Sequence, residues 1–97
     1  MARLRVEVQA GDGVRAYSLF VDGLPARMDP GHRGEAVCTG RCGDGSSHSL
    51  LYSFNGAPGS TLSVTLLCAT RIVFRLGELR IGDDGPAWRA GREAFAI

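Results

Sequence analysis

The stretch TLSVTLLC at residues 61–68 decides the fold. Leucine or valine stands at positions 62, 64 and 66 and cysteine at 68, while hydroxyl side chains stand at 61, 63 and 65. Successive side chains of a β-strand point to opposite faces, so this period of two predicts a strand with one buried face. We therefore expect Leu62, Val64, Leu66 and Cys68 to lie in a hydrophobic core.

The same period recurs along the chain. It is strict over residues 4–9 and clear over 47–54, and residues 14–21 are rich in branched and aromatic side chains. Glycine-rich turns separate the runs, and no window shows a sustained helical period. Shorter strands are expected at residues 35–39, 71–76, 79–81 and 92–97. About seven or eight short strands with little or no helix predict an all-β domain, either an antiparallel β-sandwich or a jelly-roll or barrel-like fold.

Length and composition indicate one small domain over residues 1–97. The chain is 44% hydrophobic and 22% charged, which is ordinary for a globular protein. All 11 basic residues are arginine, and 10 acidic residues nearly balance them, giving a net charge of +1. Nucleic-acid binders rely on many unopposed cations, so we expect no nucleic-acid partner.

The placement of several arginines follows from the alternation. Arg3 and Arg5 fall on the outward face of the first strand, and Arg71 and Arg75 do the same on a later one. Outward arginines commonly protect strand edges from pairing and keep a sheet soluble. The alternative is a surface that binds an acidic partner or an anionic ligand.

No segment resembles an export signal or a membrane span. Glu7 and Gln9 interrupt the apolar character of the first residues. The longest mostly apolar stretch, about residues 62–76, contains threonines and two arginines and is too short to cross a bilayer. We expect no membrane partner, a cytoplasmic protein and reduced thiols.

Two long segments are predicted to be loops. Residues 24–34 contain Pro25, Pro30 and glycines, and residues 40–46 are again rich in glycine. Long loops on a compact domain are often functional, so we expect a partner or ligand to contact these loops rather than the sheet faces. The candidate binding residues are His32, Arg33, Arg41 and Arg27.

A second pattern is the spacing H-x5-C-x3-C-x5-H formed by His32, Cys38, Cys42 and His48. These side chains are the ligand types of structural zinc sites, although the spacing is unusual for one. Free thiols and a Cys38–Cys42 disulfide remain alternatives, and no metal or cofactor is assigned. His48 alternates with Leu50 and Tyr52, which favours a hydrogen-bonded structural histidine.

The sequence contains no recognisable catalytic motif. The first hypothesis is a non-catalytic binding or protein-interaction module, whose ligand is a protein or a small molecule. The second is a metal- or small-ligand-binding protein, possibly enzymatic, centred on the His32/Cys38/Cys42/His48 region. The third is a structural subunit that forms homo-oligomers through edge strands.

Overall fold

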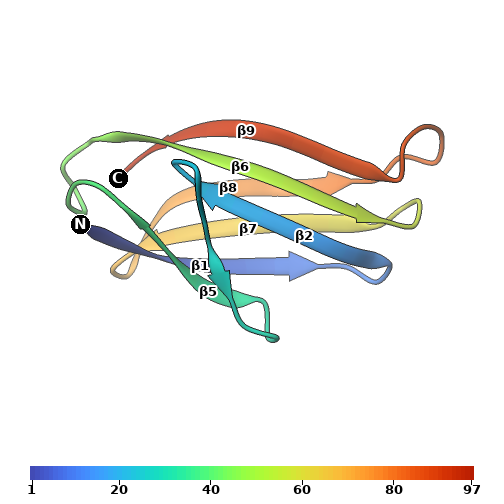
Figure 1. The fold of residues 1–97 in the computed structure, drawn as a ribbon, viewed down its shortest axis with the longest axis horizontal. Coiled ribbons are helices and arrows are strands. Elements are labelled where there is room, and N and C mark those ends of the chain that lie inside the picture. Colours follow the sequence, from blue (N-terminus) through green and yellow to red (C-terminus); the bar gives the residue numbers. More distant parts are fainter.

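Two antiparallel β-sheets pack face to face in the computed structural model, which describes residues 1–97 (Figure 1). Sheet A has the strand order β4-β5-β1-β7-β8, and sheet B has the order β3-β2-β6-β9. The molecule measures 42 × 24 × 20 Å. The strands are β1 (Ala2–Ala10), β2 (Val14–Val21), β3 (Leu24–Pro25), β4 (Arg27–Met28), β5 (Arg33–Cys38), β6 (Ser47–Gly56), β7 (Thr61–Cys68), β8 (Arg71–Arg80) and β9 (Trp88–Ala96).

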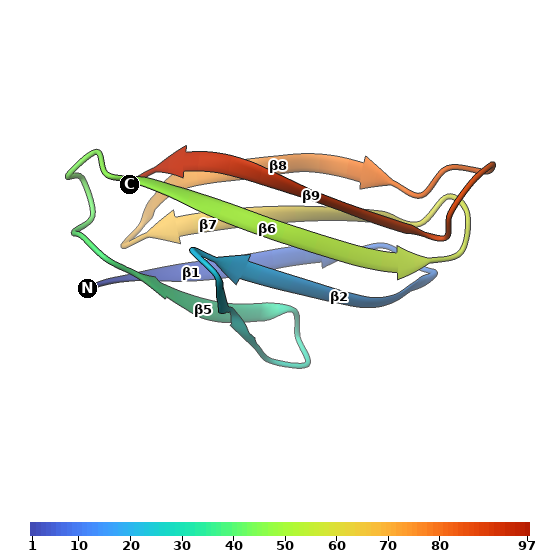
Figure 2. The same cartoon turned by 45° about the horizontal axis from the view of Figure 1, so that its top comes forward.

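The core lies between the sheets, where the inward side chains of both meet (Figure 2). Strands β1 and β7 supply one side of it, with Leu4, Val6, Leu62, Val64 and Leu66 all fully buried. Strands β2, β6 and β9 supply the other side. The predicted all-β class is therefore confirmed, and the fold is a sandwich rather than a closed barrel.

Two strands were placed accurately from the sequence. Strands β2 and β7 have the expected bounds, and Leu62, Val64, Leu66 and Cys68 point inward as expected. Because the protein contains no helix, it has no helical segment long and apolar enough to cross a membrane.

The long loop expected at residues 24–34 is wrong. This segment contains the two-residue strands β3 and β4, and β5 begins within it at Arg33. Strand β3 pairs with β2 in sheet B, whereas β4 pairs with β5 in sheet A, so the chain crosses between the sheets here. Strands of two residues are too short to show alternation, which is why the prolines dominated the prediction.

Two further boundaries differ. Residues 71–80 form one strand, β8, and shifts in its register with β7 turn Ile72 outward, where 46% of its surface is exposed. Strand β9 begins at Trp88, four residues before the expected start at Arg92. Its small and charged residues lack the apolar alternation that marks a strand in a sequence.

Candidate functional site

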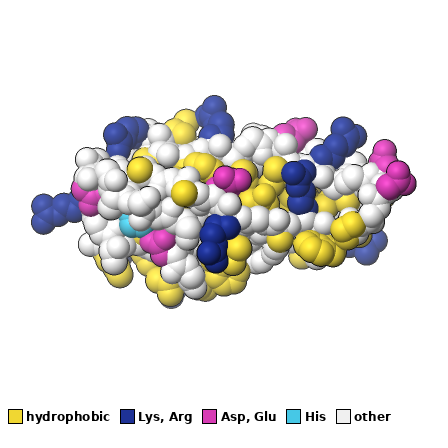
Figure 3. Space-filling model, turned by 90° about the horizontal axis from the view of Figure 1, so that it is seen from above, with side chains coloured by type: hydrophobic (Ala, Val, Ile, Leu, Met, Phe, Trp, Pro, Cys, Tyr) yellow, Lys and Arg dark blue, Asp and Glu magenta, His cyan; other side chains and the backbone are white.

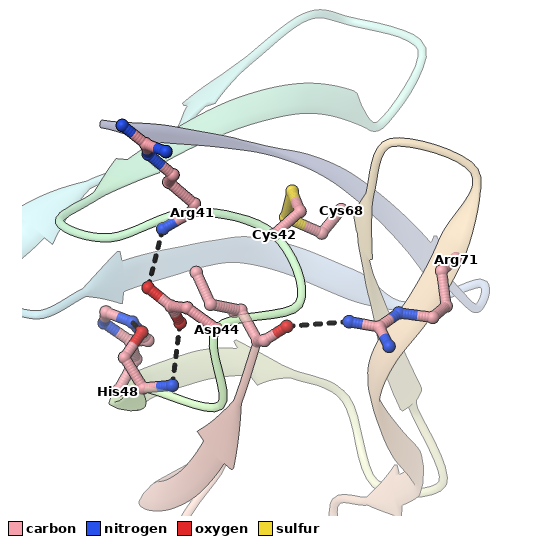
Figure 4. The surroundings of a disulfide bond; sticks show 8 residues. Arg41, Cys42, Asp44, His48, Cys68 and Arg71 are labelled. Atoms are coloured by element: carbon pink, nitrogen blue, oxygen red, sulfur yellow. Dashed lines mark hydrogen bonds between the residues drawn. A yellow bond between two sulfur atoms is a disulfide. The ribbon is translucent and has the colours of Figure 1, made fainter.

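The loop between β5 and β6 is held by hydrogen bonds to one carboxylate. Asp44 accepts bonds from the backbone N–H of Arg41 and of Ser46, each at 2.8 Å (Figure 4). Bonds from the Ser46 side chain and from these two N–H groups lower the pKa of Asp44 to about 2. Gly40 has a φ of 98°, and a Cβ there would lie 2.6 Å from the Asp44 carboxylate, so this tight turn requires glycine.

A disulfide between Cys42 and Cys68 joins this loop to the end of β7 (Figure 4). The expectation that all thiols are reduced is therefore wrong, and the alternative of a disulfide between Cys38 and Cys42 is excluded. Cys38 is free and buried, and its burial raises the pKa of the thiol. The Cys42–Cys68 pair spans 26 residues of sequence, so only the packing of the strands brings the two side chains together.

The C-terminal residue closes the same end of the sandwich. The carbonyl oxygen of Ile97 accepts hydrogen bonds from the Gly43 N–H at 2.6 Å and from the Arg71 guanidinium at 2.7 Å. In return, the Ile97 N–H donates to the carbonyl of Ser46. The loop is thus tied to β7, β8 and β9 together, and it links sheet A to sheet B.

His48 forms a hydrogen-bonded chain with Ser46 and Asp22. The Ser46 hydroxyl lies 2.8 Å from His48 Nε2, and His48 Nδ1 lies 2.6 Å from Asp22 Oδ2. The other oxygen of Asp22 accepts a bond from the Ser49 N–H. The bond from His48 lowers the pKa of Asp22. His48 is buried and hydrogen-bonded, as the sequence indicated.

These three side chains have the atom order of a nucleophile, a base and an orienting carboxylate. Two features oppose acyl transfer at Ser46. The Asp44 carboxylate, whose pKa the Ser46 side chain lowers, lies beside this hydroxyl, and a negative charge there disfavours the oxyanion that such a reaction develops. Neither Ser46 nor His48 lines any of the five main surface cavities. The hydrogen bonds among Ser46, His48 and Asp22 therefore fix the turn at Asp22 against the start of β6.

The structure does not gather the four residues of the proposed metal pattern. Cys42 is consumed by its disulfide, and His48 is bonded to Ser46 and Asp22. His32 instead forms a hydrogen bond with Tyr17, in which His32 Nδ1 lies 2.9 Å from the Tyr17 hydroxyl oxygen. No group of three or more His, Cys, Asp or Glu side chains has the geometry of a metal site.

A further group of charged side chains lies on the outer surface of sheet A. Its outward side chains include Glu7 on β1 and Glu35 on β5, each directly opposite an arginine of the neighbouring strand. Although these charges face each other, none forms an ion pair within 4.0 Å, since the only such pair in the protein is His48–Asp22. We call the outward arginines of this sheet the arginine face: Arg3, Arg5, Arg27, Arg33 and Arg75.

The arginine face is hollowed. A cavity of about 550 Å³ is lined by Arg3, Arg5 and Arg33, together with Glu7, Asp29 and Glu35. A neighbouring hollow of about 410 Å³ adds Arg27. Three guanidinium groups and three carboxylates therefore surround the first hollow, and none of them forms an ion pair within 4.0 Å.

The predicted binding residues do not form one site. Arg27 and Arg33 belong to the arginine face, and His32 immediately precedes Arg33 at the start of β5. Arg41 lies beyond the other end of β5, in the loop that carries Cys42, and its side chain points away from Asp44 (Figure 4). The two segments expected to act together are thus separated by the length of a strand.

The prediction gave Arg3 and Arg5 a role in protecting a strand edge, yet β1 is the central strand of sheet A. The signal that could have corrected this is the apolar character of the inward residues of β1, which are as buried as those of β7. A strand with such a buried face commonly has neighbours on both sides.

No protein-family model, curated protein or solved structure matches the chain at a significant level.

Proposed function

We propose that the protein is a non-catalytic interaction module that binds an acidic segment of a partner protein on the arginine face of sheet A. The observation that carries the proposal is the set of five outward arginines on one sheet, which are joined in no ion pair although Glu7, Asp29, Glu35 and Glu78 lie on the same surface. Guanidinium groups bind carboxylates through paired, charge-assisted hydrogen bonds.

Edge protection does not account for all of these arginines. It suits Arg27 and Arg75, which lie on the edge strands β4 and β8. Arg3 and Arg5 lie on the central strand, and Arg33 lies on β5, which is paired on both sides. The backbone of these strands is already hydrogen-bonded to neighbours, so a charge there protects no free edge.

An acidic polypeptide suits this surface better than a small anion. The arginines are spread along neighbouring strands and alternate with Glu7 and Glu35. A small anion would contact a few arginines and be repelled by the glutamates, whereas an extended chain can place carboxylates opposite arginines and basic or polar groups opposite glutamates.

The disulfide also bears on where the module works. Structural disulfides persist in oxidising compartments and are rare in the cytosol. The Cys42–Cys68 bond therefore favours an oxidising compartment over the cytoplasm, which was expected because no segment resembles an export signal or a membrane span. Mass spectrometry of the protein, alkylated without reduction directly from cells, tests this by the fraction that carries the bond.

The binding proposal is tested with a synthetic glutamate-rich peptide titrated by calorimetry at low and high salt. The wild-type protein should bind at low salt and weaken as salt rises, because exposed charge pairs are screened. The double variant Arg3→Glu/Arg5→Glu should lose most of this affinity. Its matched control is Arg15→Glu/Arg92→Glu, which makes the same change of charge on strands of sheet B.

The control should retain most of the affinity. Equal losses in both double variants would mean that net charge alone attracts the peptide, and the arginine face would have no special role. A wild-type protein that binds no acidic peptide even at low salt would refute the proposal. Circular dichroism of each variant checks that the fold is intact.

A further inference from the structure

Strands β8 and β9 leave two long edges side by side, one in each sheet (Figure 2). They are held together by the Phe74–Phe95 ring contact and by a hydrogen bond from the Arg89 guanidinium to the Arg80 carbonyl. Figure 3 looks onto this side of the molecule, where hydrophobic side chains are exposed between separate charged ones. Neither edge has a neighbour in its own sheet beyond it.

The two edges differ in their protection. Strand β8 has two irregularities in its register with β7, and such bulges discourage further strand pairing. Strand β9 pairs with β6 in an unbroken register over all its nine residues. Within β9, Gly91 is half-buried and Phe95 is buried, and the other seven residues are exposed. It therefore has the regular geometry that an added strand requires.

The pairing with β6 shows which backbone groups of β9 are free. Hydrogen bonds run from Ile97 N–H to the Ser46 carbonyl and from Gly56 N–H to the Ala87 carbonyl. In an antiparallel ladder the bonded positions alternate, so the odd-numbered residues of β9 face β6. The even-numbered residues, which are Trp88, Ala90, Arg92, Ala94 and Ala96, direct their N–H and C=O groups to the open edge.

We propose that β9 pairs with β9 of a second copy of this chain, antiparallel about a two-fold axis at Gly91, so that sheet B continues through both copies. In this register Arg89 lies opposite Glu93 of the second copy, and the symmetry repeats the pair. An axis at Arg92 would instead place two arginines opposite each other, and an axis at Glu93 would oppose two glutamates. Axes at Ala90 and Ala94 oppose no like charges, but they place no opposite charges together either. Opposite charges across a strand pair stabilise it and like charges destabilise it, so charge favours the axis at Gly91.

The same register suits the remaining positions. Trp88 and Ala94 of the second copy form a backbone-bonded pair, as do Ala90 and Arg92 of the second copy. Trp88, the only tryptophan, is 61% exposed in the monomer and would be partly covered by the small alanine. Gly91 meets its own copy at the axis without a side chain to separate the strands.

A single strand edge is a small interface, below the size of stable protein complexes, so the dimer should form only at high concentration. Sedimentation equilibrium of the wild-type protein from about 10 µM to about 1 mM should show a monomer–dimer equilibrium. Over the same range the emission of Trp88 should shift to the blue. A protein that remains monomeric over the whole range would overturn the proposal.

Charge exchange tests the register. Glu93→Arg should weaken dimerisation about tenfold or more, because two arginines then face each other at both positions. Arg89→Glu/Glu93→Arg should restore it, since the exchanged pair is again complementary. If Glu93→Arg has no effect, or if the double variant fails to restore the dimer although it is folded, the register is wrong.

A proline tests the use of the β9 backbone. Ala94→Pro removes an N–H that faces the open edge and is not used in the ladder with β6, so the monomer should keep its fold. The dimer should be lost. The matched control is Arg75→Glu on β8, which should leave dimerisation unchanged. Loss of the dimer in Arg75→Glu but not in Ala94→Pro would place the interface on β8 and refute the proposal.

Discussion

The outer surfaces of the two sheets differ sharply in composition, although both belong to one sandwich. Sheet A presents the arginine face with Glu7 and Glu35. The outward positions of sheet B are mainly serine and alanine, with Phe20 and Leu51 near the centre and Arg92 as the charge on β9. The buried residues on the inward sides of both sheets are mainly apolar, with His48 on β6 as a polar exception. The fold thus needs the inward residues and leaves the outward ones free, so their difference is where function is to be sought.

The largest expected effect tests the shared core beneath both faces. Leu66 is fully buried on β7, whereas its neighbour Thr65 points outward on the same strand. Leu66→Ala should lower the free energy of unfolding by about 2–5 kcal/mol through the cavity it leaves. Thr65→Ala should cost less than about 1 kcal/mol. Urea denaturation measures both, and similar losses in the two variants would show that the inward and outward sides of β7 do not differ as described.

The next effect concerns the bond that ties the two sheets at one end. Cys42→Ala/Cys68→Ala removes the disulfide and should cost about 2–4 kcal/mol of unfolding free energy, mainly because the unfolded chain is no longer cross-linked. A reducing agent should lower the stability of the wild-type protein to a similar extent. Cys38→Ala, the control, keeps the disulfide and should remain sensitive to the reductant. If reductant leaves the wild-type denaturation curve unchanged, the bond does not form in solution.

Much of the core could be predicted from the sequence, because a strand with one buried face shows a local alternation of apolar and polar residues. Alternation over residues 61–68 gave the bounds of β7 and its inward side chains, and the branched and aromatic residues over 14–21 gave the bounds of β2. This alternation is absent where a strand is very short, as in β3. It is also misleading where a bulge changes which residues point inward, as beside Ile72 in β8. It also fails in β9, because an edge strand has few neighbours and so few buried positions.

The candidate sites depended on contacts between distant residues, which alternation does not report. Asp22 looked like an ordinary turn residue, and nothing near it in the chain indicates its bond to His48. The partner of Cys42 was equally hidden, since Cys68 fits the buried pattern of β7 whether or not it is oxidised. The arginines themselves were visible, but their meaning depended on the strand order, which placed β1 at the centre of sheet A.

Acid should loosen the loop that joins the two sheets. The pKa of Asp44 falls from 3.8 to about 2 on folding, and the pKa of Asp22 is also lowered. The folded state then binds fewer protons than the unfolded state, so stability is present above about pH 4 and is lost as the pH falls towards 2. Thermal unfolding between these values should show a steeper loss in the wild-type protein than in Asp44→Asn. Asp83→Asn, in the turn before β9, serves as control and should keep the wild-type slope.

The smallest expected effect decides whether the contrast between the faces reflects folding or function. Arg5→Ser gives the central strand of sheet A the kind of outward residue that is typical of sheet B. Arg5 is exposed and forms no ion pair within 4.0 Å, so its loss should change the free energy of unfolding by no more than about 0.5 kcal/mol. The converse variant, Ala90→Arg on sheet B, should be equally neutral when measured at low protein concentration.

Denaturation in urea measures both changes, and calorimetry with the glutamate-rich peptide supplies the comparison. A variant that folds as well as the wild-type protein but binds the peptide more weakly would separate the two roles of an outward residue. A loss of more than about 1 kcal/mol in Arg5→Ser would show instead that the guanidinium supports the sheet, through the contact of its stem with neighbouring strands. The arginine face would then owe its composition to stability, because a side chain kept for binding alone should be dispensable for folding.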